Sequence, residues 1–262
     1  MYFPQCLSDS QWLVLAPLLP SKHKGCHRLR DILCAIIYVT KTGCQWRFIP
    51  LHFPPWQSVY YHFRRLLSLG VLSRMMFRLA ALIRRSKGRT EKPTAAIVDS
   101  QSVRTGAGVS VLKGWDGAKK LNGRKRHLIV DTLGLPVMIL ISGGELSDRE
   151  GLNKLSLELQ KHYPEIRILW ADRAYWGINL TGQIKTTIVQ RKDAGSRWKP
   201  VISKQQRGFE PIPKRWIVER SFAWITASRR LVRDYEKRPD CSMAFMAIAF
   251  IAICMNNLAE LS

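Results

Sequence analysis

The spacing of apolar residues changes at a polar, basic stretch from Arg84 to Pro93 (RRSKGRTEKP), and this change limits the possible folds more than any other feature. Before the stretch, apolar residues recur at helical spacing. After it, they form short strand-like runs that alternate with helical segments. With 46% hydrophobic residues in 262, the chain can build one large core or two modest ones. We therefore predict two domains, residues 1–88 and residues 89–262, with the boundary in this stretch.

Residues 1–88 are predicted to form a small all-helical domain. Ser8 and Gln11 have the spacing of a capping box at a helix start. Helices are expected after Ser8, from about Arg30 to a stop at Gly43, from Pro55 onward, and over residues 73–85. Arginines lie on and between these helices, which leaves two interpretations open: a DNA-binding unit, including one of helix-turn-helix type, or a helical cap with solvated arginines.

Residues 89–262 are predicted to form an α/β domain with a mixed sheet and flanking helices. The expected order is strand, strand, strand, helix, strand, helix, strand, helix. The expected segments are the strand AAIVDS ending in Asp99, two strands in residues 126–142 with a turn around Thr132 to Pro136, a helix capped by Ser147 and Glu150, the strand IRILWAD ending in Asp172, a short helix after Gly177, the strand at residues 186–193, a helix around Glu219, and a buried apolar helix from Met243 to Met255.

The charge balance indicates a polyanionic partner. The chain has 42 Lys and Arg against 19 Asp and Glu, a formal charge of +23 and a pI near 10.3. Solubility alone does not require such an excess. Because the basic residues are spread through folded, tryptophan-containing sequence, nucleic acid is favoured over a membrane surface.

The cysteines and apolar segments favour a cytosolic protein. The six cysteines form no CxxC pair and no zinc-finger spacing, so we expect them to be reduced and mostly buried. No basic-then-apolar leader opens the sequence. The apolar run from Met243 to Met255 is shorter than the ~20 residues that span a bilayer, so no membrane association is expected.

Three acids are the candidate catalytic and metal-binding residues. Asp99 and Asp172 are each expected at the end of a strand, where side chains project toward ligands. If the two strands are neighbours, the two carboxylates converge and repel unless they share a proton or a cation. Oxygen ligands select Mg²⁺ or Mn²⁺, and two such ions ~4 Å apart can act on a phosphodiester. Glu219, on a helix that packs against the sheet, is the predicted third ligand, with an ion pair to Arg215 as its plain alternative.

Other acids have simpler explanations. Asp131 is expected in a hairpin turn, and Asp148 and Glu150 are expected at a helix start, where capping accounts for them. Asp116 lies in a loop rich in Gly and Lys and is expected to be solvated. His127 begins a strand, where a structural role is favoured over a supporting role at the site.

The segment between Asp99 and the second strand is strongly basic. It carries seven Lys or Arg and is expected to be a loop that holds the nucleic-acid backbone, with a flexible solvated loop as the alternative. Trp115 is available there to stack on a base. The candidate DNA contacts are Arg104, Lys119, Lys120, Arg124, Lys125, Arg126, Arg215, Arg220, Arg229 and Arg230.

Several motifs in order resemble a known family. VDSQSVRT, GRKRHLIVDTLGL, ADRAYWG and RWIVERSFAWI, with LSDSQWLVLAPLLP and GCQWRFIP near the start, are similar to bacterial insertion-sequence DDE transposases of the insertion-sequence-5 group. The resemblance covers nearly the whole chain. It implies a ribonuclease H-like catalytic domain with Asp99, Asp172 and Glu219 as the metal-binding triad.

The related insertion-sequence-4 group has a tyrosine, arginine, glutamate, lysine signature, and this chain keeps only part of it. Arg215 and Glu219 have the expected spacing. Ile212 stands in place of the tyrosine and Thr226 in place of the lysine, so Arg229 or Arg230 is left for the lysine's DNA-positioning role. Only 46 residues separate Asp172 from Glu219, which leaves no room for the large β insertion of some relatives.

We therefore expect a DNA transposase that binds the terminal inverted repeats of its element, cuts at its ends and joins the 3′-hydroxyls to target DNA with two Mg²⁺ or Mn²⁺ ions. The expected partners are double-stranded DNA and, on DNA, a second copy of the chain in a homodimer. The expected location is the bacterial cytoplasm, at the nucleoid. Two alternatives stay open: an inactive DNA-binding repressor derived from a transposase, and a ribonuclease H-like nuclease that does not transfer strands.

Overall fold

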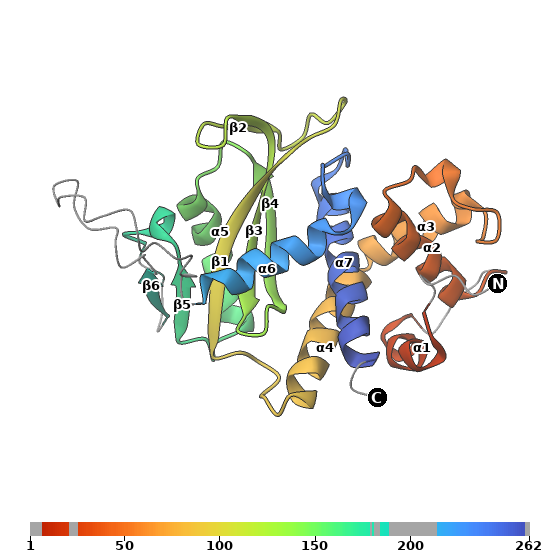
Figure 1. Cartoon of the computed structure of the whole chain (residues 1–262), viewed down its shortest axis with the longest axis horizontal. Coiled ribbons are helices and arrows are strands. Elements are labelled where there is room, and N and C mark those ends of the chain that lie inside the picture. Colours follow the sequence, from red (N-terminus) through yellow and green to blue (C-terminus); the bar gives the residue numbers. More distant parts are fainter. Residues whose placement is uncertain (1–6, 21–25, 179, 181–183, 189–213, 260–262) are drawn as a thin grey trace, which may run out of the picture.

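The structure, a computed structural model, describes residues 7–20, 26–178, 180, 184–188 and 214–259. Figure 1 shows helices α1 to α3 on one side, a curved sheet on the other, and α4 and α7 between them.

The N-terminal part is helical, as the sequence predicts. Its elements are α1 (Asp9–Leu15) with the 3-10 turn η1 (Ala16–Leu18), α2 (Leu29–Thr42), the 3-10 turn η2 (Trp46–Phe48), α3 (Trp56–Ser68) and α4 (Val71–Ser86). The capping box of Ser8 and Gln11 is formed at the start of α1. Gly43 ends α2 with a φ of 71°, a left-handed conformation that glycine adopts without a steric penalty.

The sheet is mixed, also as predicted. Its strands are β1 (Ala95–Arg104), β2 (Gly114–Asp116), β3 (Leu121–Asp131), β4 (Pro136–Gly143), β5 (Ile168–Ala171) and β6 (Lys185–Ile188). The strand order is β2-β3-β1-β5-β6, and β4 pairs with β3. β1 runs antiparallel to β3 and parallel to β5, so it lies at the junction between the two parts of the sheet.

Helices cover both faces of this sheet. Helix α5 (Asp148–His162) packs on one face in a core that includes Val98 and Ile129. Helices α6 (Arg215–Thr226) and α7 (Pro239–Ala259) pack on the other face, whose core includes Ile97 and Leu128. Alternate residues of β1 and β3 thus point to opposite faces, as the pleat of a strand requires. The mixed α/β architecture with flanking helices agrees with a ribonuclease H-like domain.

Helix α7 is the central helix of the molecule. By length and composition its segment Pro239–Leu258 could cross a membrane, but 72% of its apolar window is buried within the protein. Phe245 of α7 stacks on Phe63 of α3 with ring centroids 5.0 Å apart, while other α7 residues pack toward β4. The apolar helix predicted from the sequence is therefore a core helix that touches both the N-terminal helices and the sheet.

The predicted boundary between residues 88 and 89 falls after α4, yet one apolar core crosses it. That core contains residues of α2, α3 and α4 together with residues of the sheet, α6 and α7. A buried ion pair joins Arg84 of α4 to Asp131 at the end of β3. The division at this boundary stays a prediction, and the two parts are tightly packed against one another.

Two details differ from the sequence-based expectations. The strand predicted to end at Asp99 continues to Arg104, because it keeps pairing with β3 beyond Asp99. The basic segment expected to be a loop is largely strand, since it contains the end of β1, all of β2 and the start of β3. The short helix predicted after Gly177 and the end of the strand predicted at residues 186–193 fall largely outside the described residues.

Most of the described cysteines are buried, as predicted. Cys34, Cys241 and Cys254 are buried, Cys44 is half-buried and Cys26 is exposed. Cys6 lies outside the described residues.

Candidate active site

Asp99 lies on β1 at the point where its parallel neighbour ends. The register pairs Ala95 with Ile168 and Ile97 with Trp170. If this register is extended by two residues, Asp99 lies next to Asp172 on the neighbouring chain segment. The Ser100 N–H donates to the Asp99 carboxylate at 2.8 Å, which fixes the rotamer of this side chain.

Asp172, predicted as the last residue of its strand, directly follows β5 and is the N-cap of the 3-10 turn η3 (Arg173–Tyr175). Its Oδ1 accepts a hydrogen bond from the Ala174 N–H at 2.9 Å, so the side chain caps the turn. The second carboxylate oxygen, Oδ2, faces Arg215. The cap therefore orients this acid toward α6.

Glu219 is placed by the amphipathic pattern of α6. Val218, Phe222 and Ile225 are buried against the sheet and α7, as their spacing predicts. Ser221 anchors the helix through a 2.9 Å hydrogen bond from its hydroxyl to the Gly134 carbonyl. Glu219 lies beside this buried stripe and its side chain is 54% exposed.

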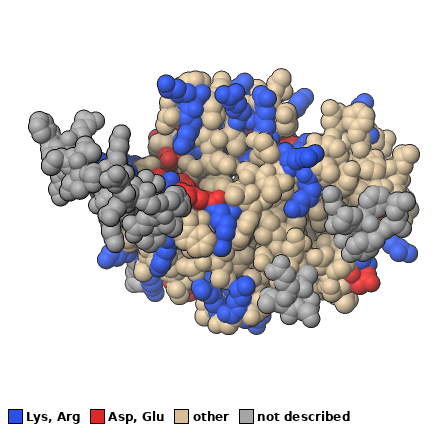
Figure 2. All heavy atoms as spheres, in the orientation of Figure 1, with Lys and Arg blue, Asp and Glu red and all other residues tan. Residues whose placement is uncertain are grey.

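Arg215 connects the acids. Its Nε is 3.1 Å from Glu219 Oε1, and its Nη2 is 3.6 Å from Asp172 Oδ2. The ion pair of Arg215 with Glu219 is the plain interaction expected from the sequence, and the contact with Asp172 extends it to a second element. Figure 2 shows a group of acidic atoms left of the centre of the view, with basic atoms next to them.

The electrostatics of Asp99 show that Asp172 and Glu219 are near enough to act on it. Burial raises the pKa of the Asp99 carboxyl to about 6, with repulsion from Asp172 and Glu219 contributing; the Ser100 N–H and the Arg215 guanidinium oppose this rise. Acids that are up to 120 positions apart in the sequence are thus near enough in space for their charges to affect the pKa of Asp99.

The chemistry of these side chains fits a hard divalent cation, since carboxylate oxygens are its preferred ligands. Within the described residues, no three His, Cys, Asp or Glu side chains are close enough together to hold a metal ion. Arg215 lies between two of the acids and sets their spacing. The carboxylate donor set suits a hard divalent cation, but its members are not close enough together for one in this arrangement.

Four of the predicted DNA contacts are exposed. Arg104 ends β1, Lys119 and Lys120 lie between β2 and β3, and Arg229 follows α6. Trp115 of β2 is 58% exposed. These side chains are available to a polyanion, and their contact with DNA stays a prediction.

Three of the predicted DNA contacts are buried, and this corrects the expectation for them. Arg124 is fully buried and its guanidinium contacts Asp234 at 3.2 Å. Arg126 is fully buried and donates to the Leu231 carbonyl. Lys125 is buried and donates to the Leu146 carbonyl at 2.8 Å. Because these residues lie in the middle of the sheet, their charged groups bind partners inside the protein and are not exposed to a bound polyanion.

The remaining basic candidates already have partners. Arg220 lies between the rings of Trp216 and Trp224, with its guanidinium carbon 4.6 and 4.5 Å from the two ring centroids. Arg230 pairs with Glu236 at 2.6 Å. The stack of Trp216, Arg220 and Trp224 was not predicted, although its spacing of four residues on a helix is a readable signal.

The competing acids behave mostly as expected. Asp131 accepts backbone hydrogen bonds in the β3–β4 turn, and Ser147 and Glu150 form the capping box of α5. Asp116 is the exception, because it is buried and lies 3.6 Å from Lys125, where the sequence suggested solvation. His127 is buried with its Nε2 2.9 Å from the Ser142 hydroxyl, so it has a structural role.

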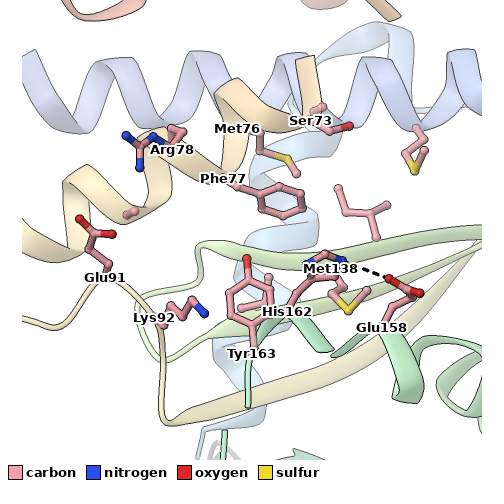
Figure 3. Close-up of a pocket in the computed structure, with 15 residues that line it drawn as sticks. Ser73, Met76, Phe77, Arg78, Glu91, Lys92, Met138, Glu158, His162 and Tyr163 are labelled. Atoms are coloured by element: carbon pink, nitrogen blue, oxygen red, sulfur yellow. Dashed lines mark hydrogen bonds and ion pairs between the residues drawn. The ribbon is translucent and has the colours of Figure 1, made fainter. Parts of the chain in front are cut away.

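A separate cavity of about 500 Å³ lies between α4, α7 and the edge strand β4. Figure 3 shows Met76, Phe77 and Met138 beside it, together with the contact between Glu158 and His162. None of the three candidate acids lines it. The carboxylate cluster therefore lies in another part of the molecule.

Two family models match this chain. One, described as "Putative transposase of IS4/5 family", matches residues 7–76, and the other, described as "Transposase DDE domain", matches residues 90–255. A curated protein of Burkholderia cepacia, "Putative transposase for insertion sequence element IS402", is 28% identical over 149 residues, which is 52% of this chain and 64% of that protein. The matched region thus covers less than two thirds of the relative. No solved structure matches.

Proposed function

The chain belongs to the IS4/5 family of DDE-domain transposases, and we propose that it cuts and joins DNA at the ends of an insertion sequence. The observation that carries the proposal is the gathering of Asp99, Asp172 and Glu219 around Arg215, from strand β1, the turn after β5 and helix α6. The family implies dependence on a divalent metal in general.

We assign the three acids as the metal ligands, with two Mg²⁺ ions, or Mn²⁺, as the finer proposal. Bound ions would activate the attacking oxygen and stabilise the leaving oxygen of a phosphodiester. The protein's own part is positional. The Ser100 N–H and the Ala174 N–H hold the rotamers of Asp99 and Asp172, and the buried face of α6 fixes the height of Glu219 over the sheet.

The DNA is proposed to lie across this face. Arg104, Lys119, Lys120 and Arg229 are exposed cations that suit a phosphate backbone, and the net charge of +23 favours such a partner. The N-terminal helices would bind the terminal inverted repeats. Two ends cut together imply a homodimer on DNA, acting in the bacterial cytoplasm at the nucleoid.

Replacement of Glu219 tests this function. Glu219→Ala is expected to abolish Mg²⁺-dependent nicking of DNA that carries the element's ends, while binding to the same DNA survives. Nick mapping on end-labelled DNA measures the first property, and gel retardation measures the second. Asp99→Ala and Asp172→Ala should behave in the same way.

The matched control is Glu158→Ala. Glu158 is also a helical acid with a basic side chain, His162, four residues away, and its side chain is likewise 54% exposed. It lines the separate cavity, so nicking should be unchanged. If Glu219→Ala nicks as well as the parent, the assignment is wrong. Salt-dependent DNA binding by the parent with no metal-dependent nicking would instead support the repressor, and cutting without strand joining would support the nuclease.

A further inference from the structure

Arg215 lies where a cation balances the acid cluster. Its guanidinium contacts Glu219 at 3.1 Å and Asp172 at 3.6 Å, and its charge also acts on Asp99. Three carboxylates held together repel one another unless a positive charge lies among them. In the structure this charge is a side chain of the protein itself.

The position of Arg215 allows it to move without disturbing the core. It is the first residue of α6, and its side chain is 31% exposed. The helix is held by the buried side chains of Val218 and Phe222 and by the hydrogen bond of Ser221 to Gly134, and none of these contacts involves the Arg215 side chain. A change of the Arg215 rotamer therefore leaves the packing of α6 intact.

We propose that Arg215 is the resident cation of this cluster and competes with divalent metal ions for Asp172 and Glu219. The inference rests on the metal site of the proposed function. A guanidinium and a divalent ion that share the same carboxylates repel each other, so each weakens the binding of the other. Arg215 must swing away when the metal binds, and the acids then draw together.

This competition has a functional consequence. The interactions of Arg215 with the acids must be given up on metal binding, so they lower the apparent affinity for metal. The cluster is then charge-balanced at low metal concentration and fills with metal only at a higher one. Arg215 thereby sets the metal concentration at which the transposase becomes competent to cut.

The test measures metal binding rather than activity. Mn²⁺ is titrated calorimetrically into the full chain, previously treated with chelator and dialysed, in the absence of DNA. Arg215→Gln should bind Mn²⁺ roughly three- to tenfold more tightly than the parent, as expected for the loss of two or three partly exposed charge interactions. Arg215→Lys keeps the charge but cannot contact two carboxylates with a planar guanidinium. Its Mn²⁺ affinity should lie between those of the parent and Arg215→Gln.

Arg220→Gln is the matched control. It removes one positive charge from the same helix, but the Arg220 guanidinium lies between Trp216 and Trp224 and donates to the Leu133 carbonyl. Its Mn²⁺ affinity should stay within about twofold of the parent if only the contacts of Arg215 matter. Thermal unfolding in chelator verifies that each variant is folded.

The outcomes separate this inference from the proposed function. If Asp99→Ala binds Mn²⁺ as tightly as the parent, the metal site itself is misassigned. If Asp99→Ala loses Mn²⁺ but Arg215→Gln binds no more tightly than the parent, the metal site stands and the competition by Arg215 is refuted. Equal tightening in Arg215→Gln and Arg220→Gln would also refute it, since the effect would then be one of overall charge.

Discussion

Arg124 and Lys119 come from the same basic segment of sequence, but their surroundings differ completely. Arg124 is fully buried, pairs with Asp234 and donates to the Val111 and Glu236 carbonyls, whereas Lys119 is exposed. Arg124→Ala leaves the buried Asp234 without its cation and should lower the free energy of unfolding by about 3–5 kcal/mol. Urea unfolding of the variant and the parent measures this difference.

Lys119→Ala is the control for this substitution, because it also removes one positive charge from the segment. Its free energy of unfolding should stay within about 0.5 kcal/mol of the parent. If the two substitutions destabilise the protein equally, the buried role of Arg124 is wrong.

His127 makes the stability depend on pH. Burial lowers the pKa of its imidazole to about 4; Asp148 opposes this shift, and Lys125 and Lys154 add to it. The neutral ring therefore stabilises the fold fully above the unfolded pKa of about 6.5, and this contribution is lost as the pH falls through 4. The loss should reach at most about 3 kcal/mol in the free energy of unfolding.

Unfolding experiments at several pH values compare the parent with His127→Gln, which has no titrating side chain at this position. The variant's stability should fall less steeply between pH 6.5 and 4. Parallel curves for the two proteins would contradict the assigned role.

At the scale of elements, α5 and β3 meet at a contact that only glycine permits. A Cβ added to Gly151 would lie 2.1 Å from Cε1 of His127, a buried ring that Ser142 holds in place. Glycine-to-alanine changes inside a helix usually stabilise it by up to about 1 kcal/mol. Here the sign should reverse, and Gly151→Ala should destabilise the protein by roughly 1–3 kcal/mol.

Thermal unfolding measures the effect, and Asn153→Ala on the exposed side of α5 is its control. That change replaces a residue of lower helix propensity by alanine without a clash, so it should be neutral or slightly stabilising. A Gly151→Ala protein as stable as Asn153→Ala would show that α5 and β3 separate easily.

Most elements could be predicted because local patterns determine them. The capping boxes at Ser8 and Ser147, the αL glycine at Gly43 and the helical spacing of Val218, Phe222 and Ile225 each depend on a few neighbouring residues. The position of Asp172 at the C-terminal end of β5 was predicted for the same reason. So was the position of Glu219 on α6.

The extent of β1 and the burial of the basic segment could not be read locally. β1 continues past Asp99 because β3 pairs with it, and that pairing joins distant residues. The pairing places Arg124 and Arg126 inside the protein. There Arg124 forms an ion pair with Asp234, and Arg126 donates a hydrogen bond to a backbone carbonyl. A basic run in sequence does not reveal which of its cations have such internal partners.

At the scale of the whole molecule, the N-terminal helices and the sheet share one apolar core, and α7 completes it. We therefore expect the chain to unfold in one cooperative transition, although the sequence suggested two domains. Urea unfolding followed by tryptophan fluorescence and by far-UV circular dichroism should give coincident curves. Two separate steps, or an isolated fragment of residues 89–262 that unfolds cooperatively on its own, would contradict this expectation.

The position of α7 in the sequence also bears on how the protein is made. Helices α2, α3 and α4 are synthesised early, but the helix that covers them begins only at Pro239, more than 150 residues after Ser86. At translation rates of about 5–20 residues per second, the apolar faces of these helices stay exposed for on the order of ten seconds or more before α7 is synthesised. The nascent chain thus exposes apolar surface during this interval, and we expect slower synthesis to lengthen the time in which it can aggregate.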